Sequence, residues 1–389
     1  MAIDVQEMIG FLRELVRVRS VAETGEAAAA ALVEARMRAF GWSPAVTEVA
    51  PGRPNVIALV DGGGGPGPTL AFEGHTDVVT EGSLADWTVD PYGAELRDGR
   101  VYGRGSADMK AGLAAMIYAV AALQDAGPFP GSVLVCALAD EEGMMLGAKQ
   151  ACASGVFDGV DGVIVCEPED GEVCAVAKGA LRLRVSFAGK MAHGAMPLHG
   201  RNPLPALGRL LSAAGALQER LQEEHGEHEH LGAVYLTPTV ASGGVASQVN
   251  VIPGSAEVYF DVRTIPGCDH ASIVAAVSSL AREAGGEVVA SVTVIDDRPP
   301  VDTPVSHPVV AALAYAHEAV TGSPARYGGV PGTTDGTILS RDAGLATVVY
   351  GPGGKWIAHQ ADEFVLVDEV ERCAHVYLAA ARRFLGCVD

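Results

Sequence analysis

Four apolar segments of this chain each lead into side chains that could bind a metal ion or move a proton. In chain order they are TLAFEG with His75 and Asp77, GSVLVCALA with Asp140, Glu141 and Glu142, DGVIVC with Glu167, and ATVVYGPGGKWIA with His359. A single His-x-Asp pair is also typical of a capped strand end with a solvent-facing acid. The recurrence of the pattern at four segment ends is what favours a chemical role.

Histidine and carboxylate side chains together suit zinc or a similar divalent ion, and several carboxylates suit two ions about 3.5–4 Å apart. Without a metal, so many acids at one place would repel one another, and the charge of the metal removes that objection. His75 and Asp77 lie two positions apart, so in an extended segment their side chains share a face. The pattern therefore indicates a metal-dependent reaction centre.

The elements that must position these side chains alternate between strands and helices. We expect helices near residues 3–19 and 25–40, a strand at NVIALV, and a further helix in MKAGLAAMIYAVAALQDAG after Asp108. This alternation predicts an α/β fold with a mostly parallel sheet flanked by helices, in which ligands bind beyond the carboxyl ends of the strands. DGGGGPGP at 61–68 is expected to be a flexible surface loop.

The middle of the chain has a different pattern. ALRLRVSFAG, a helix near 203–222, VYLTPTVASGG, GSAEVYFDVRT, a helix near 270–284 and EVVASVTVI follow one another in β-α-β-β-α-β order. This order resembles a ferredoxin-like α+β sandwich. We therefore expect three parts: residues 1–179 as the first part of a catalytic domain, 180–295 as an inserted dimerisation or lid domain, and 296–389 as the second part of the catalytic domain.

The length and composition restrict the class of protein. A chain of 389 residues is long enough for two or three domains, and 49% hydrophobic with 19% charged residues fits a soluble globular protein. The formal net charge of −21 argues against nucleic acid or anionic lipid as a partner, because both require clustered Lys and Arg. No uninterrupted apolar run reaches the roughly 18 residues of a membrane span.

The compartment follows from the N-terminus and the cysteines. MAIDVQEMIGFLRELVRVRS carries acids and a helical apolar pattern, which is not that of a signal peptide. The seven cysteines form no Cys-x-x-Cys pair and are odd in number, which indicates reduced thiols and a cytoplasmic protein.

Three other segments could carry chemistry and are assigned none. EEHGEHEHLG at 223–232 could bind a metal adventitiously, but it is interpreted as a solvated loop between a helix and a strand. DGGGGPGP lacks the Lys and Ser or Thr of a phosphate-binding loop, and GVASQ lacks the Gly-x-Ser-x-Gly of a serine hydrolase.

The ordered set of motifs resembles the zinc-dependent family of aminoacylases, carboxypeptidase G, acetylornithine deacetylase and succinyl-diaminopimelate desuccinylase. The matching stretches are GHTDVV (74–79), DWTVDPYGAELRDGRVYGRGSADMKAGLAAM (86–116), DEEG (140–143), CEP (166–168), GKMAHGAMPLHGRNP (189–203), NVIPGSAEVYFDVR (250–263), and GPG with AHQADEFV (351–365). Any one of these motifs is weak, but seven in order with suitable spacing are specific. The resemblance covers essentially the whole chain.

The resemblance implies two divalent ions per chain, most simply zinc, with cobalt or manganese as alternatives. Carried over by position, His75 and His359 correspond to terminal ligands on separate metals, and Asp108 corresponds to the carboxylate that bridges them. Glu142 and Glu167 complete the set, one on each metal. Read without the resemblance, Asp108 in GRGSADMKAG is better explained as a plain helix N-cap, the commonest role of such an aspartate.

The resemblance also implies the reaction. Glu141 acts as the general base that deprotonates a metal-bridged water, the hydroxide attacks an amide carbonyl, and Glu141 returns the proton to the leaving amine. Asp77 is interpreted as the carboxylate that holds the imidazole of His75 in the correct tautomer. Asp140 is expected only to cap or hydrogen-bond its loop.

The inserted domain supplies further expected site residues. His193 in AGKMAHGAMP matches the family position that reaches the active site of a partner subunit and steadies the oxyanion, which implies a homodimer. Asn250, Arg263, Gly332 and Thr333 match substrate-binding positions, and Arg263 suits a carboxylate. A salt bridge on the strand surface is the alternative for Arg263.

The expected substrate is a small N-acylated amino acid, such as N-acetylornithine or N-succinyl-diaminopimelate, that loses an acetyl-type or succinyl-type group. The alternatives are a dipeptidase or glutamate-type carboxypeptidase of the same fold, and a metal-binding relative without catalysis. Retention of Glu141 argues against the last, because a purely binding site has no need of a base. GKMAHGAMPLHGRNP and GTTDG depart from the desuccinylase pattern, so the acyl group stays open.

Overall fold

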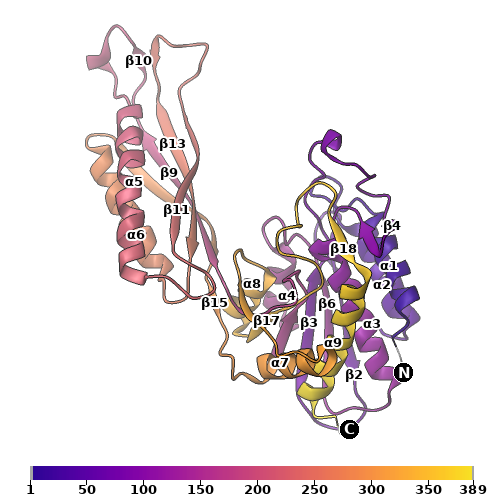
Figure 1. The fold of residues 1–389 in the computed structure, drawn as a ribbon. Coiled ribbons are helices and arrows are strands. Elements are labelled where there is room, and N and C mark those ends of the chain that lie inside the picture. The colour runs from indigo at the N-terminus through magenta and orange to yellow at the C-terminus, as the bar shows by residue number, and fades with distance from the viewer. Residues whose placement is uncertain (1–2, 388–389) are drawn as a thin grey trace. The chain divides into compact units, whose positions relative to one another are not determined.

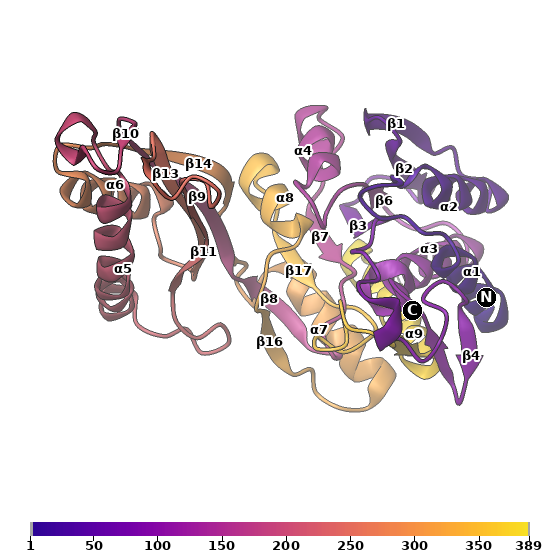
Figure 2. The same cartoon turned by 90° about the horizontal axis from the view of Figure 1, so that it is seen from above.

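A computed structural model describes residues 3–387 (Figures 1 and 2). The chain divides into two compact units. Among the described residues, the first comprises 3–175, 302–330 and 334–387, and the second comprises 176–301 and 331–333. The second unit is thus continuous apart from three residues, 331–333, that join it from a later part of the chain. Its main segment begins four residues before the expected boundary at 180 and ends six residues after the expected boundary at 295.

The first unit is built on a nine-stranded sheet in the order β1-β2-β6-β3-β7-β17-β8-β15, with β16 paired to β8. Its strands are β1 Ala45–Ala50, β2 Arg53–Asp61, β3 Thr69–His75, β6 Ser132–Leu138, β7 Gly162–Val165, β8 Val173–Ala177, β15 Val301–Asp302, β16 Tyr327–Val330 and β17 Thr347–Val349. The four central strands, β6, β3, β7 and β17, run parallel to their neighbours in this group. The antiparallel pairings β1–β2, β2–β6 and β17–β8 flank them.

Helices cover both faces of this sheet. They are α1 Val5–Val16, α2 Ala27–Ala39, α3 Ala111–Asp125, α4 Leu146–Ala153, α7 Pro308–Thr321, α8 Asp335–Ala343 and α9 Val367–Leu385. Figure 2 shows α4 and α8 on one side of the sheet and α3, α7 and α9 on the other. The structure therefore confirms the expected class, a largely parallel sheet flanked by helices, and burial on both faces explains why β3, β6 and β7 are almost wholly apolar.

The helix ends differ from the expected ones for local reasons. The first helix begins at Val5 because the carboxylate of Asp4 caps it and accepts the Glu7 N–H at 2.9 Å. The helix expected directly after Asp108 begins at Ala111, because Asp108 and Met109 have non-helical backbone angles within the preceding irregular turn, Ser106–Lys110. The turn separates Asp108 from the regular helix.

The segment Ser106–Asp125 is long and apolar enough by composition to cross a membrane, but 94% of its apolar window is buried inside the protein. Its helical part, α3, packs closely on the sheet: a Cβ at Gly112 would lie 2.0 Å from the Cys166 carbonyl oxygen. Only glycine allows this approach. The composition of α3 is therefore that of a core helix of this unit.

Loop 61–68 is held by pairing rather than left free. Gly62 and Gly64 donate to the carbonyl oxygens of Gly131 and Phe129, and the Phe129 N–H donates back to Gly62. A side chain at Gly62 would overlap Phe129, with a Cβ only 2.0 Å from its carbonyl oxygen. The glycines of this loop serve close backbone approach as well as turning.

A small three-stranded sheet, β18-β5-β4, completes the first unit, with β4 Glu95–Arg97, β5 Arg100–Tyr102 and β18 Phe364–Leu366. It lies between two segments of the chain that carry candidate ligands, because β5 is followed by Asp108 and β18 is preceded by His359. The antiparallel pairing of Phe364 with Tyr102 brings the two segments together.

The second unit has a four-stranded antiparallel sheet in the order β11-β13-β9-β14. Its elements are β9 Gly179–Ala188, β10 Ala192–His193, α5 Leu204–His225, β11 Tyr235–Gly243, β12 Val251–Ile252, β13 Ser255–Thr264, α6 His270–Gly285 and β14 Val289–Arg298. This is the expected β-α-β-β-α-β sandwich, with one short addition, the ribbon of β10 and β12. Strands β9 and β13 alternate between buried and part-exposed residues, as expected for a sheet with one covered face.

Candidate metal centre

The carboxyl ends of the four central parallel strands gather most of the predicted ligands at one edge of the sheet. His75 is the last residue of β3 and lies opposite Leu138 at the end of β6. Glu167 follows β7, and the loop that carries His359 follows β17, which pairs with β7. Neighbouring parallel strands end at a common edge, so residues far apart in the sequence meet there.

Asp108 lies at the centre of the cluster. One carboxylate oxygen lies 3.1 Å from Nε2 of His75, and the other lies 3.2 Å from Nε2 of His359. The turn that presents Asp108 begins after Gly105, whose φ of +79° is a left-handed conformation. A Cβ at Gly105 would also lie 2.4 Å from the Val78 side chain. Glycine therefore lets the chain turn sharply into the site.

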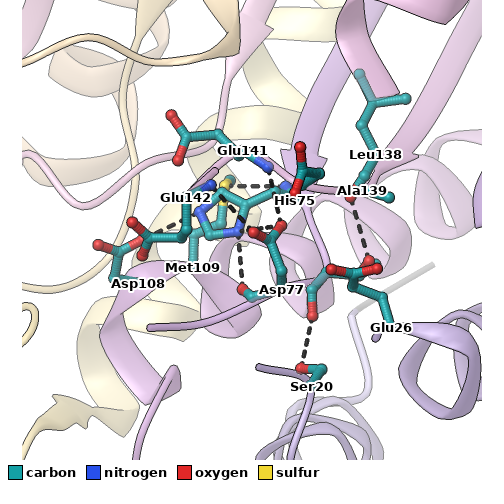
Figure 3. Close-up of polar contacts among 12 residues, drawn as sticks. Ser20, Glu26, His75, Asp77, Asp108, Met109, Leu138, Ala139, Glu141 and Glu142 are labelled. Atoms are coloured by element: carbon teal, nitrogen blue, oxygen red, sulfur yellow. Dashed lines mark hydrogen bonds and ion pairs between the residues drawn. The ribbon is translucent and has the colours of Figure 1, made fainter. Parts of the chain in front are cut away.

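Asp108 belongs to two groups of three possible metal ligands, one with His75 and Glu167 and one with Glu142 and His359. Figure 3 shows His75, Asp108 and Glu142 of these groups. In the first, Nε2 of His75 lies 3.3 Å from Glu167 in addition to its contact with Asp108. In the second, Nε2 of His359 lies 2.9 Å from Glu142 as well as near Asp108. The ligand atoms of each group lie within 4.8 Å of one another, and a third such group consists of His75, Glu141 and Glu142.

Asp77 connects the first histidine to the turn after β6 (Figure 3). Its two carboxylate oxygens accept the backbone N–H groups of Glu141 at 3.1 Å and Glu142 at 3.0 Å. The Nδ1 atom of His75 lies 2.9 Å from the Asp77 backbone oxygen and 3.4 Å from its carboxylate. Asp77 thus contacts His75 mainly through its main chain, while its carboxylate fixes the Glu141–Glu142 turn.

Asp140 has the structural contacts expected of it. Its φ is +67°, and its carboxylate accepts the Met144 N–H at 3.0 Å and pairs with Arg53 at 2.8 Å. Arg53 also pairs with the buried Glu26 at 2.6 Å. These contacts brace the turn that presents Glu141.

The cluster has the electrostatics of a cation site. Burial and then the charge of Asp108 raise the pKa of Glu167 to about 8. Burial opposes protonation of His75, but Glu167 and Asp108 outweigh it and raise the pKa of that imidazole well above its usual value. The hydrogen bonds to Asp108 and then to Glu142 raise the pKa of His359 to about 10. The acids thus draw positive charge into the site.

The side chains present fit a pair of divalent ions. Two imidazoles and three carboxylates converge from separate segments, and their nearest contacts are made by Nε2 and carboxylate oxygens, the atoms that zinc prefers. His75 directs Nδ1 to Asp77, so its Nε2 remains directed at the acids. His75, Asp108 and Glu167 would hold one ion, and Asp108, Glu142 and His359 the other.

The remaining predicted site residues belong to the second unit. His193 is exposed, and its Nδ1 accepts the Ala195 N–H at 3.1 Å. The carbonyl oxygen of Asn250 accepts the Gly194 N–H at 2.7 Å, so Asn250 lies beside the His193 turn. Arg263 forms an ion pair with Asp261 on the same strand at 2.6 Å, the alternative that the sequence left open.

The 331–333 segment carries the last two of these residues. The hydroxyl of Thr333 accepts from Arg298 at 3.3 Å, and Gly332 has open space where a Cβ would lie. Two residues later Asp335 is buried at the start of α8. The GTTDG stretch thus passes from the second unit back into the first.

Sequence reasoning missed several buried charges around the centre. Glu73 is buried within β3, where burial and then the charge of Asp335 raise its pKa well above the usual value. A charged residue inside the apolar run TLAFEG was the available signal. Arg104 and Glu363 form a buried ion pair, and no local pattern marks them as partners, because 258 residues lie between them.

Known proteins match this chain over most of its length. The model of peptidase family M20/M25/M40 matches residues 71–383. A succinyl-diaminopimelate desuccinylase from Methylorubrum extorquens is 31% identical over 383 residues, which cover 95% of this chain and 96% of that protein. A probable succinyl-diaminopimelate desuccinylase from Staphylococcus epidermidis is 29% identical over 370 residues, which cover 87% and 88%.

Solved structures share the fold. An M20 family metallo-carboxypeptidase from Sulfolobus solfataricus superimposes with a TM-score of 0.78 at 20% identity, over 99% of this chain and 100% of that one. A dinuclear metal binding peptidase of the M20 family from Bacillus subtilis gives a TM-score of 0.73 at 17% identity, over 99% of each chain.

Proposed function

The chain belongs to peptidase family M20/M25/M40, a family of hydrolases, and we propose that it is a dinuclear metal-dependent amidohydrolase acting on N-acylated amino acids. The acyl group is of the acetyl or succinyl type, as in N-acetylornithine or N-succinyl-diaminopimelate. The relatives named as desuccinylases support the succinyl type.

The observation that carries the proposal is the position of Asp108. Its two oxygens face two different histidines at 3.1 and 3.2 Å, and each histidine also meets its own glutamate. A single tetrahedral ion uses four ligands, whereas this arrangement offers five with one shared. It therefore supports two ions with Asp108 between them, most simply zinc, with cobalt or manganese as alternatives.

Glu141 is the proposed general base. When bound, the two ions would lower the pKa of a water molecule and polarise the amide carbonyl. Glu141 is 7% exposed, and burial raises its pKa well above the usual range, which makes its carboxylate a better proton acceptor. Glu141 takes the proton from the attacking water and gives it to the leaving amine. Asp77 holds the Glu141 backbone for this exchange.

We further propose that the protein is a cytoplasmic homodimer that pairs through its second unit. Six cysteines of the described residues are free thiols, which fits a reducing compartment: Cys136, Cys152, Cys166, Cys174, Cys268 and Cys373. Strand β11 lies at an edge of the four-stranded sheet and is exposed along most of its length, so a second copy could pair with it. His193 would then complete the active site of the partner and stabilise the oxyanion. Asn250 and Arg263 would bind the substrate, together with Gly332 and Thr333.

The test is a release assay over acetyl, succinyl and formyl amino acids and dipeptides, each run with zinc, cobalt and manganese. The proposal predicts release of free amino acid from acyl substrates, abolished by a chelator and by Glu141→Gln. Hydrolysis of dipeptides alone would assign the protein to the peptidases of the family. Tight metal binding without any hydrolysis would indicate a relative that has lost catalysis.

A further inference from the structure

The loop between β17 and β18 carries His359 but has only turns to define its shape. His359 itself has a φ of +65°, and its side chain remains 51% exposed. A ligand on such a loop reaches the right place only if other groups fix its backbone. The same need exists for Asp108, whose turn has non-helical backbone angles.

The Glu363 carboxylate fixes the Asp108 turn. Glu363 is fully buried, four residues beyond His359. One of its carboxylate oxygens accepts two consecutive backbone N–H groups, that of Ala107 at 2.9 Å and that of Asp108 at 3.1 Å. Its own carbonyl oxygen accepts the Gly103 N–H at 2.9 Å. The end of the His359 loop is thus joined directly to the turn that presents Asp108.

The Arg104 guanidinium fixes the other candidate ligand. Arg104 is 2% exposed and forms an ion pair with the second carboxylate oxygen of Glu363. Its Nη2 atom donates to the carbonyl oxygen of His359 at 3.2 Å. The guanidinium carbon lies 5.2 Å from the centre of the Trp87 ring, so the arginine is held in its place.

We propose that the Arg104–Glu363 ion pair is a positioning device that sets the separation between Asp108 and His359. It thereby sets the geometry of the second metal position, the one formed by Asp108, Glu142 and His359. The inference rests on the proposed dinuclear function. Neither residue is a ligand or a catalytic residue, and each acts through the backbone of a ligand. Within residues 3–387, neither His75 nor Glu167 forms a hydrogen bond or ion pair with Arg104 or Glu363. The ion held by His75, Asp108 and Glu167 would therefore depend on the Arg104–Glu363 pair only through Asp108.

If the Arg104–Glu363 pair only stabilised the fold, replacing both residues by apolar side chains would leave metal binding unchanged. A buried ion pair can often be replaced by apolar side chains of similar size without loss of stability, whereas removing one partner leaves an unpaired buried charge. Single substitutions therefore disturb both folding and metal binding. Replacing both residues by methionine restores charge balance but cannot restore the hydrogen bonds to Ala107, Asp108 and His359.

The experiment measures zinc bound per chain by equilibrium dialysis over a series of buffered free-zinc concentrations, and the wild type is also dialysed against cobalt and against manganese. The variants are Glu363→Gln, Arg104→Met, and the double variant Arg104→Met with Glu363→Met. Thermal unfolding of each metal-free protein is recorded alongside. The matched control is Asp296→Asn, which breaks a buried arginine–aspartate pair of 2.6 Å in the second unit.

We expect the wild type to bind two ions and the double variant to unfold near the wild-type temperature. In the double variant, the second metal position should bind zinc roughly 10- to 100-fold more weakly than in the wild type, and the zinc affinity of the first position should change less. Asp296→Asn should leave both affinities unchanged. A stable double variant with wild-type affinity for both ions would overturn the positioning role while leaving the proposed function intact. A wild type that binds no zinc, cobalt or manganese would overturn the proposed function and the positioning role together.

Discussion

Glu26 should make the stability of the protein depend on pH near neutrality. Its side chain is fully buried, and Oε1 lies 2.6 Å from Nη1 of Arg53. Burial and then the charge of Asp77 raise the pKa of Glu26 to about 7, and Arg53 opposes the rise without cancelling it. The perturbation that isolates this group is Glu26→Gln, which keeps the size and removes the titration.

The direction in which stability changes with pH follows from the number of protons bound by the folded and unfolded states. The pKa of Glu26 is about 7 in the folded protein against an ordinary value of 4.5, so between these values the folded state binds more protons than the unfolded state. Its contribution to stability is therefore fully present below pH 4.5 and is lost as the pH rises through 7. A difference of about 2.5 pKa units corresponds to at most about 3 kcal/mol.

The assay is urea unfolding of the chelated wild type and Glu26→Gln at pH 5 and pH 8. The free energy of unfolding of the wild type, taken relative to the variant, should fall by up to about 3 kcal/mol between the two pH values. Taking the difference cancels the groups that titrate alike in both proteins. A difference that stays constant, or that grows with pH, would refute the assignment of a raised pKa to Glu26.

Three further substitutions test other parts of the account. Glu141→Gln should keep both metals and the fold but lower turnover by roughly 10²- to 10⁴-fold, and loss of metal would instead make Glu141 a ligand. Mixing His193→Ala with Glu141→Gln after reversible dissociation should restore about a quarter of the wild-type activity, because half the dimers would carry one intact site. An inactive mixture that contains heterodimers would exclude action in trans. Lys355→Met should lower the free energy of unfolding by about 3–5 kcal/mol, because the carboxylate of Glu169, 2.7 Å from Lys355, would remain buried without its ion-pair partner. A loss below about 1 kcal/mol in urea unfolding would contradict this.

The fold could be predicted because the local patterns of apolar and polar residues formed the expected strands and helices in the folded protein. Apolar runs that end in polar residues marked the parallel strands, and the edge that gathers His75, Glu142 and Glu167 follows from strand direction. The alternation of β9 and β13 marked a half-covered antiparallel sheet. The family was recognisable because seven motifs occur in order, and the family match confirms it.

The buried ion pairs around the site could not be predicted, because the partners in each pair lie far apart in the sequence. Arg104 finds Glu363, and Arg53 finds Glu26 and Asp140, only after the chain has folded. Nor did the composition of 61–68 indicate pairing with Phe129, since glycine-rich loops are usually open to solvent. The roles of individual ligands and of His193 stay predictions, since they depend on bound metal, substrate and a partner subunit.

The central claim is that Asp108 stands between two metal ions, and elemental analysis of the fully active protein tests it most directly. After removal of loosely bound ions, the account predicts two divalent ions per chain, lost together with activity when a chelator is added. One ion per chain at full activity would contradict the bridging role of Asp108.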